Sequence, residues 1–111
     1  MARRVLSGNN IFVEETTNLD AVTSATTGTA IDCRWYNRVS VQINCSVNTG
    51  AVTVTIQASV DGTNWHDLNA KTYTATTAVD LFKYTSYYPY IRTVTSTQSN
   101  STITTYVVGR S

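Results

Sequence analysis

The chain has 111 residues, the length of one domain, and carries a formal net charge of +1 with only 14% of its residues charged. A charge this close to zero gives no electrostatic basis for binding nucleic acid or an anionic membrane, and no apolar run approaches the roughly 18 residues of a membrane helix. Hydrophobic residues at 41% exclude disorder, and Thr, the most frequent residue, favours β-structure.

The N-terminal segment Met1–Gly8 contains two arginines but lacks the apolar stretch of a secretory signal, so we expect synthesis in a cytoplasm. We expect residues 1–10 to form a flexible N-terminal arm and residues 11–111 to form a single domain. Arg3 and Arg4 are adjacent basic residues in that arm. They have two interpretations: a solvated terminus, or an arm that reaches an acidic partner surface.

Short strands are expected next at Ile11–Thr16, Ala21–Thr26 and Thr29–Trp35. The clearest signal follows over Val39–Val60, where apolar and polar residues alternate on both sides of Asn48-Thr49-Gly50. A period of two is typical of a half-buried strand, and Asn and Gly are turn residues. We therefore expect one long antiparallel hairpin with one dry face. We expect Cys45, at an apolar position of this hairpin, and Cys33 to be reduced thiols.

Asp61-Gly62 follows this hairpin directly and is a strong turn signal, because both residues tolerate positive φ. A further strand should start near Thr63 and carry Trp65 and Leu68. We expect Asp61 and Gly62 to make the turn and Trp65 to bury its ring against the core.

The remaining strands are expected at Tyr73–Thr76 and Val79–Tyr84, and in a C-terminal hairpin of Tyr88–Thr97 and Thr102–Val108. No window has the apolar spacing of a helix. About eight short strands at this spacing indicate an all-β fold, a sandwich or a small barrel. We expect an antiparallel β-sandwich of jelly-roll or Ig-like type.

Residues for catalysis are scarce. His66 is the one histidine, and Asp67 beside it would point to the opposite face of a strand, so the two cannot form a simple catalytic pair. A metal site needs clustered ligands, and the sequence contains no such cluster. We therefore expect no catalytic residue, no metal, no cofactor and no enzyme activity.

The remaining cluster is aromatic: Tyr84, Tyr87, Tyr88 and Tyr90. Alternating rings of this kind either fill a core or lie on the surface, where they contact a partner or stack on sugar. Strand alternation places Tyr87 on the face opposite Tyr88 and Tyr90, so at least one ring should face outward.

Gln57-Ala-Ser-Val-Asp-Gly-Thr-Asn-Trp65-His-Asp-Leu68, followed by Tyr88-Pro-Tyr-Ile-Arg92 and a last strand rich in Thr and Val, resembles small β-sandwich virion proteins of tailed bacteriophages. These include head decoration (cement) proteins and fibre-associated modules, and the resemblance covers roughly Val39–Arg110. The Ser-x-Asp-Gly-x-x-Trp turn also resembles a turn in discoidin-like carbohydrate-binding modules. It resembles the Asp-box of sialidases too, but the Asp-box has one more residue between its Asp and Gly.

The phage resemblance implies a virion accessory protein, above all a decoration protein that binds and stabilises the assembled capsid. Its expected partner is the major capsid protein or another virion protein, and it is expected to form a homo-oligomer. Its expected location is the virion, after synthesis in the host cytoplasm. Arg3, Arg4, Tyr87 and Tyr88 are the expected partner contacts. The alternative is a carbohydrate-binding module of a tail or head fibre, with glycan stacked on Trp35 or on the tyrosine cluster.

Overall fold

The computed structural model describes residues 2–6, 12–85 and 87–110, with side chains from residue 15 onward. These residues form seven strands and no helix, and every strand pairing is antiparallel. The all-β, antiparallel prediction is confirmed. The strands are β1 (Ala2–Leu6), β2 (Phe12–Val22), β3 (Ile31–Asp32), β4 (Arg38–Ser59), β5 (His66–Thr74), β6 (Ala78–Tyr84) and β7 (Tyr90–Arg110).

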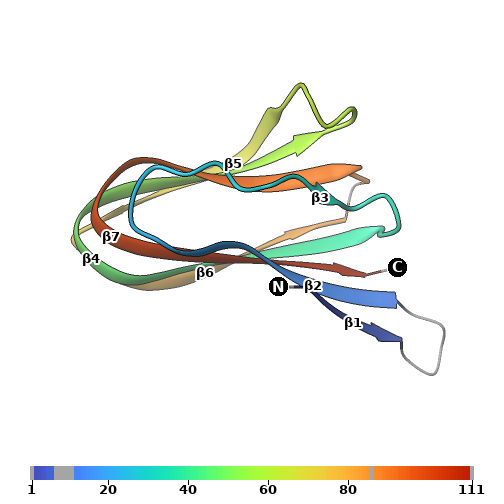
Figure 1. The fold of residues 1–111 in the computed structure, drawn as a ribbon, viewed down its shortest axis with the longest axis horizontal. Helices are drawn as coiled ribbons and strands as arrows, with labels where there is room; N and C mark the ends of the chain where they lie inside the picture. Colours follow the sequence, from blue (N-terminus) through green and yellow to red (C-terminus); the bar gives the residue numbers. More distant parts are fainter. Residues whose placement is uncertain (1, 7–11, 86, 111) are drawn as a thin grey trace.

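Two long strands, β4 with 22 residues and β7 with 21, form the centre of the fold. They pair with each other along almost their whole length, from Arg38 opposite Arg110 to Ser59 opposite Tyr90. Both strands curve back at one end of the molecule, so each passes through an upper and a lower layer (Figure 1). The expectation of about eight short strands is therefore wrong in number and in length.

The two predicted hairpins are also wrong, because each is one bent strand. The halves of Val39–Val60 pair with β7 and not with each other, and the same holds for the C-terminal segment with β4. β2 likewise joins the described part of the predicted strand Ile11–Thr16, from Phe12 on, to the start of the next predicted strand. Only Ile31–Asp32 of Thr29–Trp35 forms a strand.

The bend in β4 explains why turn residues did not produce a turn. Register shifts lie between Cys45 and Val47 and between Asn48 and Ala51. They move the buried side chains from odd to even positions, so that Val47 is 54% exposed while Asn48 is buried. The Asn48 side chain accepts a hydrogen bond from Gly50 N and donates one to Thr76 O. The polar residues thus stabilise a change of strand direction.

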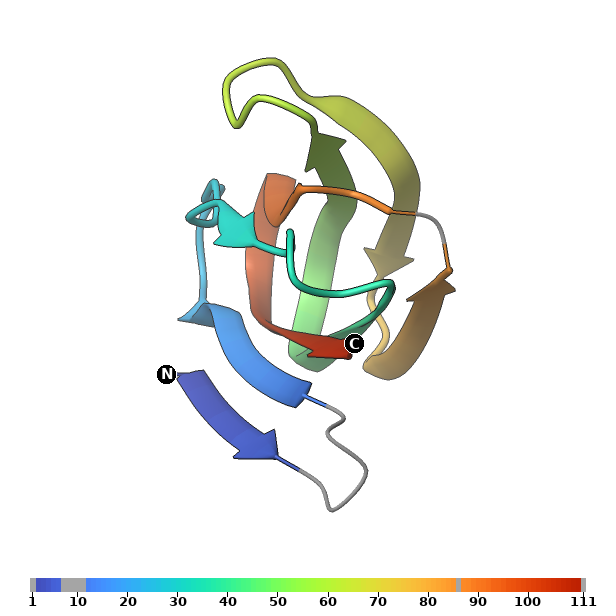
Figure 2. The same cartoon turned by 90° about the vertical axis from the view of Figure 1, so that its right-hand side faces the viewer.

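The lower layer contains β1, β2, the C-terminal half of β7, the N-terminal half of β4, and β6. The upper layer contains β3, the N-terminal half of β7, the C-terminal half of β4, and β5. Viewed from the end opposite the bend, β5 and β6 lie at one side of the molecule and β1 and β2 at the other (Figure 2).

The core lies between these layers and consists mainly of β-branched residues from β4 and β7. The alternating positions that the sequence assigned to a dry face, such as Val41, Ile43, Val54 and Ile56, are fully buried. Cys33 and Cys45 are buried as thiols, in agreement with the prediction. Burial raises the pKa of the Cys45 thiol, which lowers its reactivity.

The predicted N-terminal arm contains β1, which pairs with β2 and places Arg3 opposite Glu15 and Arg4 opposite Glu14. Residues 1 and 7–10 of that arm, and Ile11, lie outside the described residues. The flexibility of the arm stays a prediction.

Candidate functional site

The loop between β4 and β5 is built around the Asp61 carboxylate. Its Oδ1 atom accepts hydrogen bonds from the backbone amides of Thr63 and Asn64 at 2.8 Å and from Ser59 Oγ at 2.9 Å, and its Oδ2 atom accepts one from the Asn64 side chain. These hydrogen bonds hold the pKa of Asp61 well below its usual range. The backbone amides of Asn64 and Thr63 contribute most, followed by the side chains of Asn64 and Ser59. Gly62 adopts φ +78°, which L side chains rarely do. The structure thus places both predicted turn residues in the turn, while β5 starts at His66, later than expected.

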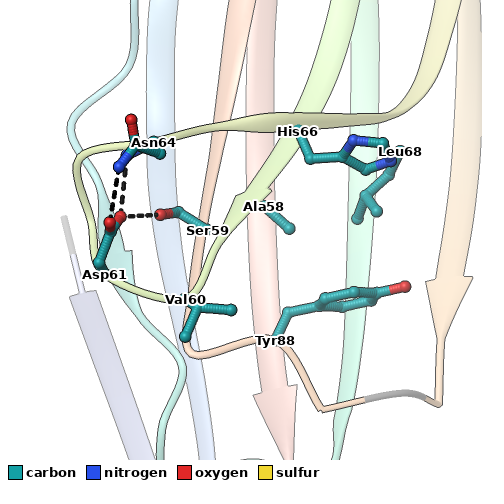
Figure 3. A pocket seen from close by; sticks show the side chains of 8 residues that line it. All are labelled: Ala58, Ser59, Val60, Asp61, Asn64, His66, Leu68 and Tyr88. Atoms are coloured by element: carbon teal, nitrogen blue, oxygen red, sulfur yellow. Dashed lines mark hydrogen bonds between the residues drawn. The ribbon is translucent and has the colours of Figure 1, made fainter.

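A pocket of about 320 Å³ lies beside this loop. Figure 3 shows the Tyr88 ring on one side, His66 and Leu68 on the other, and Ala58 between them. Val60 and the Asp61–Asn64 network close one end (Figure 3). The lining is mostly apolar and includes the side chains of Asn64, His66 and Tyr88, a composition typical of small-ligand sites.

The tyrosine cluster divides between this pocket and the surface. Tyr84 and Tyr88 meet edge to face with ring centroids 6.0 Å apart, and both pack partly against the core. Burial, with a smaller contribution from Tyr88, raises the pKa of Tyr84 to about 12. Tyr87 is 57% exposed, so at least one ring faces outward as expected, and Trp35 is 77% exposed.

The structure places Trp65 at the surface and not in the core. Its ring is half-buried, and the guanidinium carbon of Arg92 lies 4.1 Å from the ring centroid. Arg92 comes from the outer face of β7, between buried Ile91 and Thr93.

The predicted partner contacts are not all brought together. Tyr88 shares the pocket with Asp61, whereas Arg3 and Arg4 lie on β1 at the opposite side of the molecule from the connection between β6 and β7 (Figure 2). The side chains of Arg3 and Arg4 lie outside the described part.

His66 is exposed on the pocket rim, and Asp67 accepts a hydrogen bond from Gln57 Nε2 instead. Among the described residues no group of three or more His, Cys, Asp or Glu side chains could hold a metal ion. Within those same residues, no helix is long and apolar enough to span a membrane.

The sequence pattern does not indicate the pocket or the contact between Trp65 and Arg92. The pocket is lined by residues of β4, β5, their connecting loop and the segment before β7, whose proximity depends on long-range strand register. One signal was present for Arg92, a charged residue at an outward position of an alternating strand.

The fold and this surface define the class of the protein: an antiparallel all-β domain of two facing layers, with a mostly apolar pocket lined by the half-buried Tyr88. No protein-family model and no curated protein matches the chain.

Solved structures do share the fold. The SPBc2 prophage-derived protein YomS matches with a TM-score of 0.65 at 12% identity, over 100% of this chain and 96% of its own. The PBSX exported protein XepA matches with a TM-score of 0.54 at 16% identity, over 100% of this chain and 37% of its own. PirA matches with a TM-score of 0.51 at 14% identity, over 89% of this chain and 93% of its own. At these identities the likeness establishes the fold alone.

Proposed function

We propose that this protein is a structural accessory protein of a phage virion, and specifically a head decoration protein that binds and stabilises the assembled capsid without catalysing a reaction. The observation that carries the proposal is the likeness to YomS, which is prophage-derived and superposes over nearly the full length of both chains. The PBSX exported protein XepA contains the same fold within a longer chain.

We also propose that the folded-over sheet is a β-sandwich in which β4 and β7 run through both layers. The surface supports self-association, because Val79 and Leu81 on the outer face of β6 are 67% and 54% exposed. Apolar side chains exposed together on a flat face are typical of protein interfaces. The protein would then act as a homo-oligomer on the virion.

Arg3, Arg4, Tyr87 and Tyr88 are the proposed contacts with the shell. Each copy needs only weak contacts, because many linked copies on a lattice add avidity.

The test is sedimentation of the purified protein with shells assembled from the major capsid protein of the phage that encodes it. We expect saturable co-sedimentation that Arg3→Ala with Arg4→Ala, or Tyr87→Ala, weakens without changing the melting temperature. Lys71→Ala removes one exposed positive charge from β5 and should bind as the unmodified protein does. Recovery of the protein only in the supernatant would contradict the proposal.

A carbohydrate-binding module of a tail or head fibre is the second candidate, favoured by the pocket beside Tyr88. An aromatic wall with an amide and an imidazole on its rim suits a sugar ring. Binding on a glycan array that Tyr88→Ala abolishes and Trp35→Ala retains would favour this candidate. No binding to any glycan would exclude it.

A further inference from the structure

We propose that Arg92, held against Trp65, is a preorganised receptor for a carboxylate on an acidic segment of a protein partner. The inference deepens the proposed function, because it rests on that partner being a virion protein and names the chemistry of its contacting side chain.

Trp65 and Arg92 pack against each other. The Asp61 hydrogen bonds fix the backbone of Thr63 and Asn64, immediately before Trp65. The Arg92 guanidinium then lies 4.1 Å from the centroid of the Trp65 ring, within the range of a cation–π interaction. Such a contact favours one conformation of a long side chain before any ligand arrives.

A row of hydrogen-bonded side chains crosses three strands, β5, β4 and β7. Asp67 Oδ1 accepts a hydrogen bond from Gln57 Nε2 at 2.8 Å, which fixes the orientation of the Gln57 amide. Gln57 Oε1 therefore faces Arg92 and accepts a hydrogen bond from Arg92 Nε at 2.8 Å. Because Nε is engaged, the guanidinium presents the edge formed by its two Nη groups, which matches the two oxygens of a carboxylate.

Arg92 and Arg34 differ in whether a neighbouring carboxylate compensates their charge. Arg34 provides the comparison, because its guanidinium lies 5.6 Å from the Tyr90 ring and forms an ion pair with Asp32 at 2.7 Å. Arg92 makes no ion pair with any side chain that the structure describes, and its polar partner is the neutral Gln57. The charge of exposed Asp67 is separated from Arg92 by the Gln57 amide and is screened by water. Arg92 is thus an ordered but uncompensated cation.

Arg92 occupies one face of the Trp65 ring, so that face is not available for stacking on a sugar. Trp and Arg are instead the residues that most often dominate binding energy in protein interfaces. An Asp or Glu side chain from a protein would complete the bidentate pair.

The test uses poly-L-glutamate as the probe and Trp65 fluorescence as the readout. The chain has two tryptophans, so Trp35→Phe leaves Trp65 as the one indole in every protein used. We expect a saturable change in emission with poly-L-glutamate and none with poly-L-glutamine. Arg92→Met should weaken binding by at least about tenfold, the effect of losing a charge-assisted pair.

Two further variants keep the result specific. Gln57→Glu should weaken binding to a similar degree, because it supplies a competing carboxylate while Arg92 and Trp65 both remain. Arg34→Met removes the cation already paired with Asp32 and should change the affinity by less than about twofold. Thermal melts check that each variant is folded.

The inference is overturned if poly-L-glutamate gives no saturable change, or if Arg34→Met weakens binding as much as Arg92→Met. Equal, Arg92-dependent binding of polygalacturonate would overturn the assignment to a protein partner in favour of an acidic glycan. Sedimentation with shells is a separate measurement. Arg92-dependent binding of the probe without shell binding would contradict the proposed function and leave the carboxylate site standing.

Discussion

The hydroxyl oxygens of Thr93 and Thr105 lie 2.7 Å apart in the buried space between the layers, and they join the two halves of one strand, β7. Leu19 N donates to Thr105 Oγ1 at 3.0 Å, and Thr93 Oγ1 donates to Asn18 Oδ1 at 2.6 Å. Because a hydroxyl carries one proton, Thr105 must be the donor to Thr93. The hydrogen bonds therefore run in one direction from Leu19 back to its neighbour Asn18, at the bulge where β2 changes register.

Thr105→Val should destabilise the protein by about 1–3 kcal/mol, because it leaves the buried amide of Leu19 without its acceptor. Thr102→Val is the matched control on the same strand, at a half-buried position, and should cost less than about 0.5 kcal/mol. Urea unfolding of both variants measures the difference. Equal effects would show that the buried chain of hydroxyls does not contribute to stability.

Asn48→Ala should destabilise the bend in β4 by about 1–3 kcal/mol, because the buried side chain bonds both Gly50 N and Thr76 O. Asn44→Ala, earlier on the same strand, removes an amide that pairs with the Gln42 side chain and should cost less. Chemical denaturation compares the two. A larger loss for Asn44→Ala would contradict this role for Asn48.

Gly109 lies under the ring of Tyr36, where an added Cβ would come within 2.2 Å of Tyr36 Cδ2. Since Tyr36 is only 5% exposed, its ring cannot move into solvent without loss of packing. Gly109→Ala should therefore cost about 1–3 kcal/mol. In a Tyr36→Ala background the same substitution should cost much less, and an unchanged cost in this double-mutant cycle would place the strain elsewhere.

Asp61 should make stability depend on pH. Its folded-state pKa lies below the unfolded value near 4, so its contribution is present above about pH 4 and is lost as the pH falls towards the folded-state pKa. Asp61→Asn should lower the melting temperature at pH 7, and the difference from the unmodified protein should shrink below pH 4. A difference that is constant from pH 7 to pH 2 would contradict this account.

The sequence predicted which residues are buried better than it predicted how the strands connect. Alternation over Val39–Cys45 and Val52–Ala58 correctly assigned the dry face, because each half-strand contributes one face to the core. Polar residues such as Asn48-Thr49-Gly50 interrupt that alternation in the same way whether the chain makes a hairpin turn or a bend within one strand. The distinction depends on pairing with β7, far along the chain, which a local pattern does not contain.

The candidate site shows the same division between local and long-range information. Asp61 and Gly62 were predictable because their turn is made by residues within the Ser59–Asn64 segment. The position of Trp65 was not, because its contact with Arg92 requires the register that places Gln57 opposite Arg92. A large ring after a turn was therefore assigned to the core, although a cation on a distant strand holds it at the surface.

The central claim, that this protein decorates a phage head, is tested most directly by its copy number on purified particles of the phage that encodes it. Quantitative mass spectrometry would measure the ratio of this chain to the major capsid protein. A decoration protein binds at sites that repeat over the whole shell, so we predict a number of copies comparable to that of the shell protein. Absence from the particles, or a few copies that remain with separated tails, would contradict the claim.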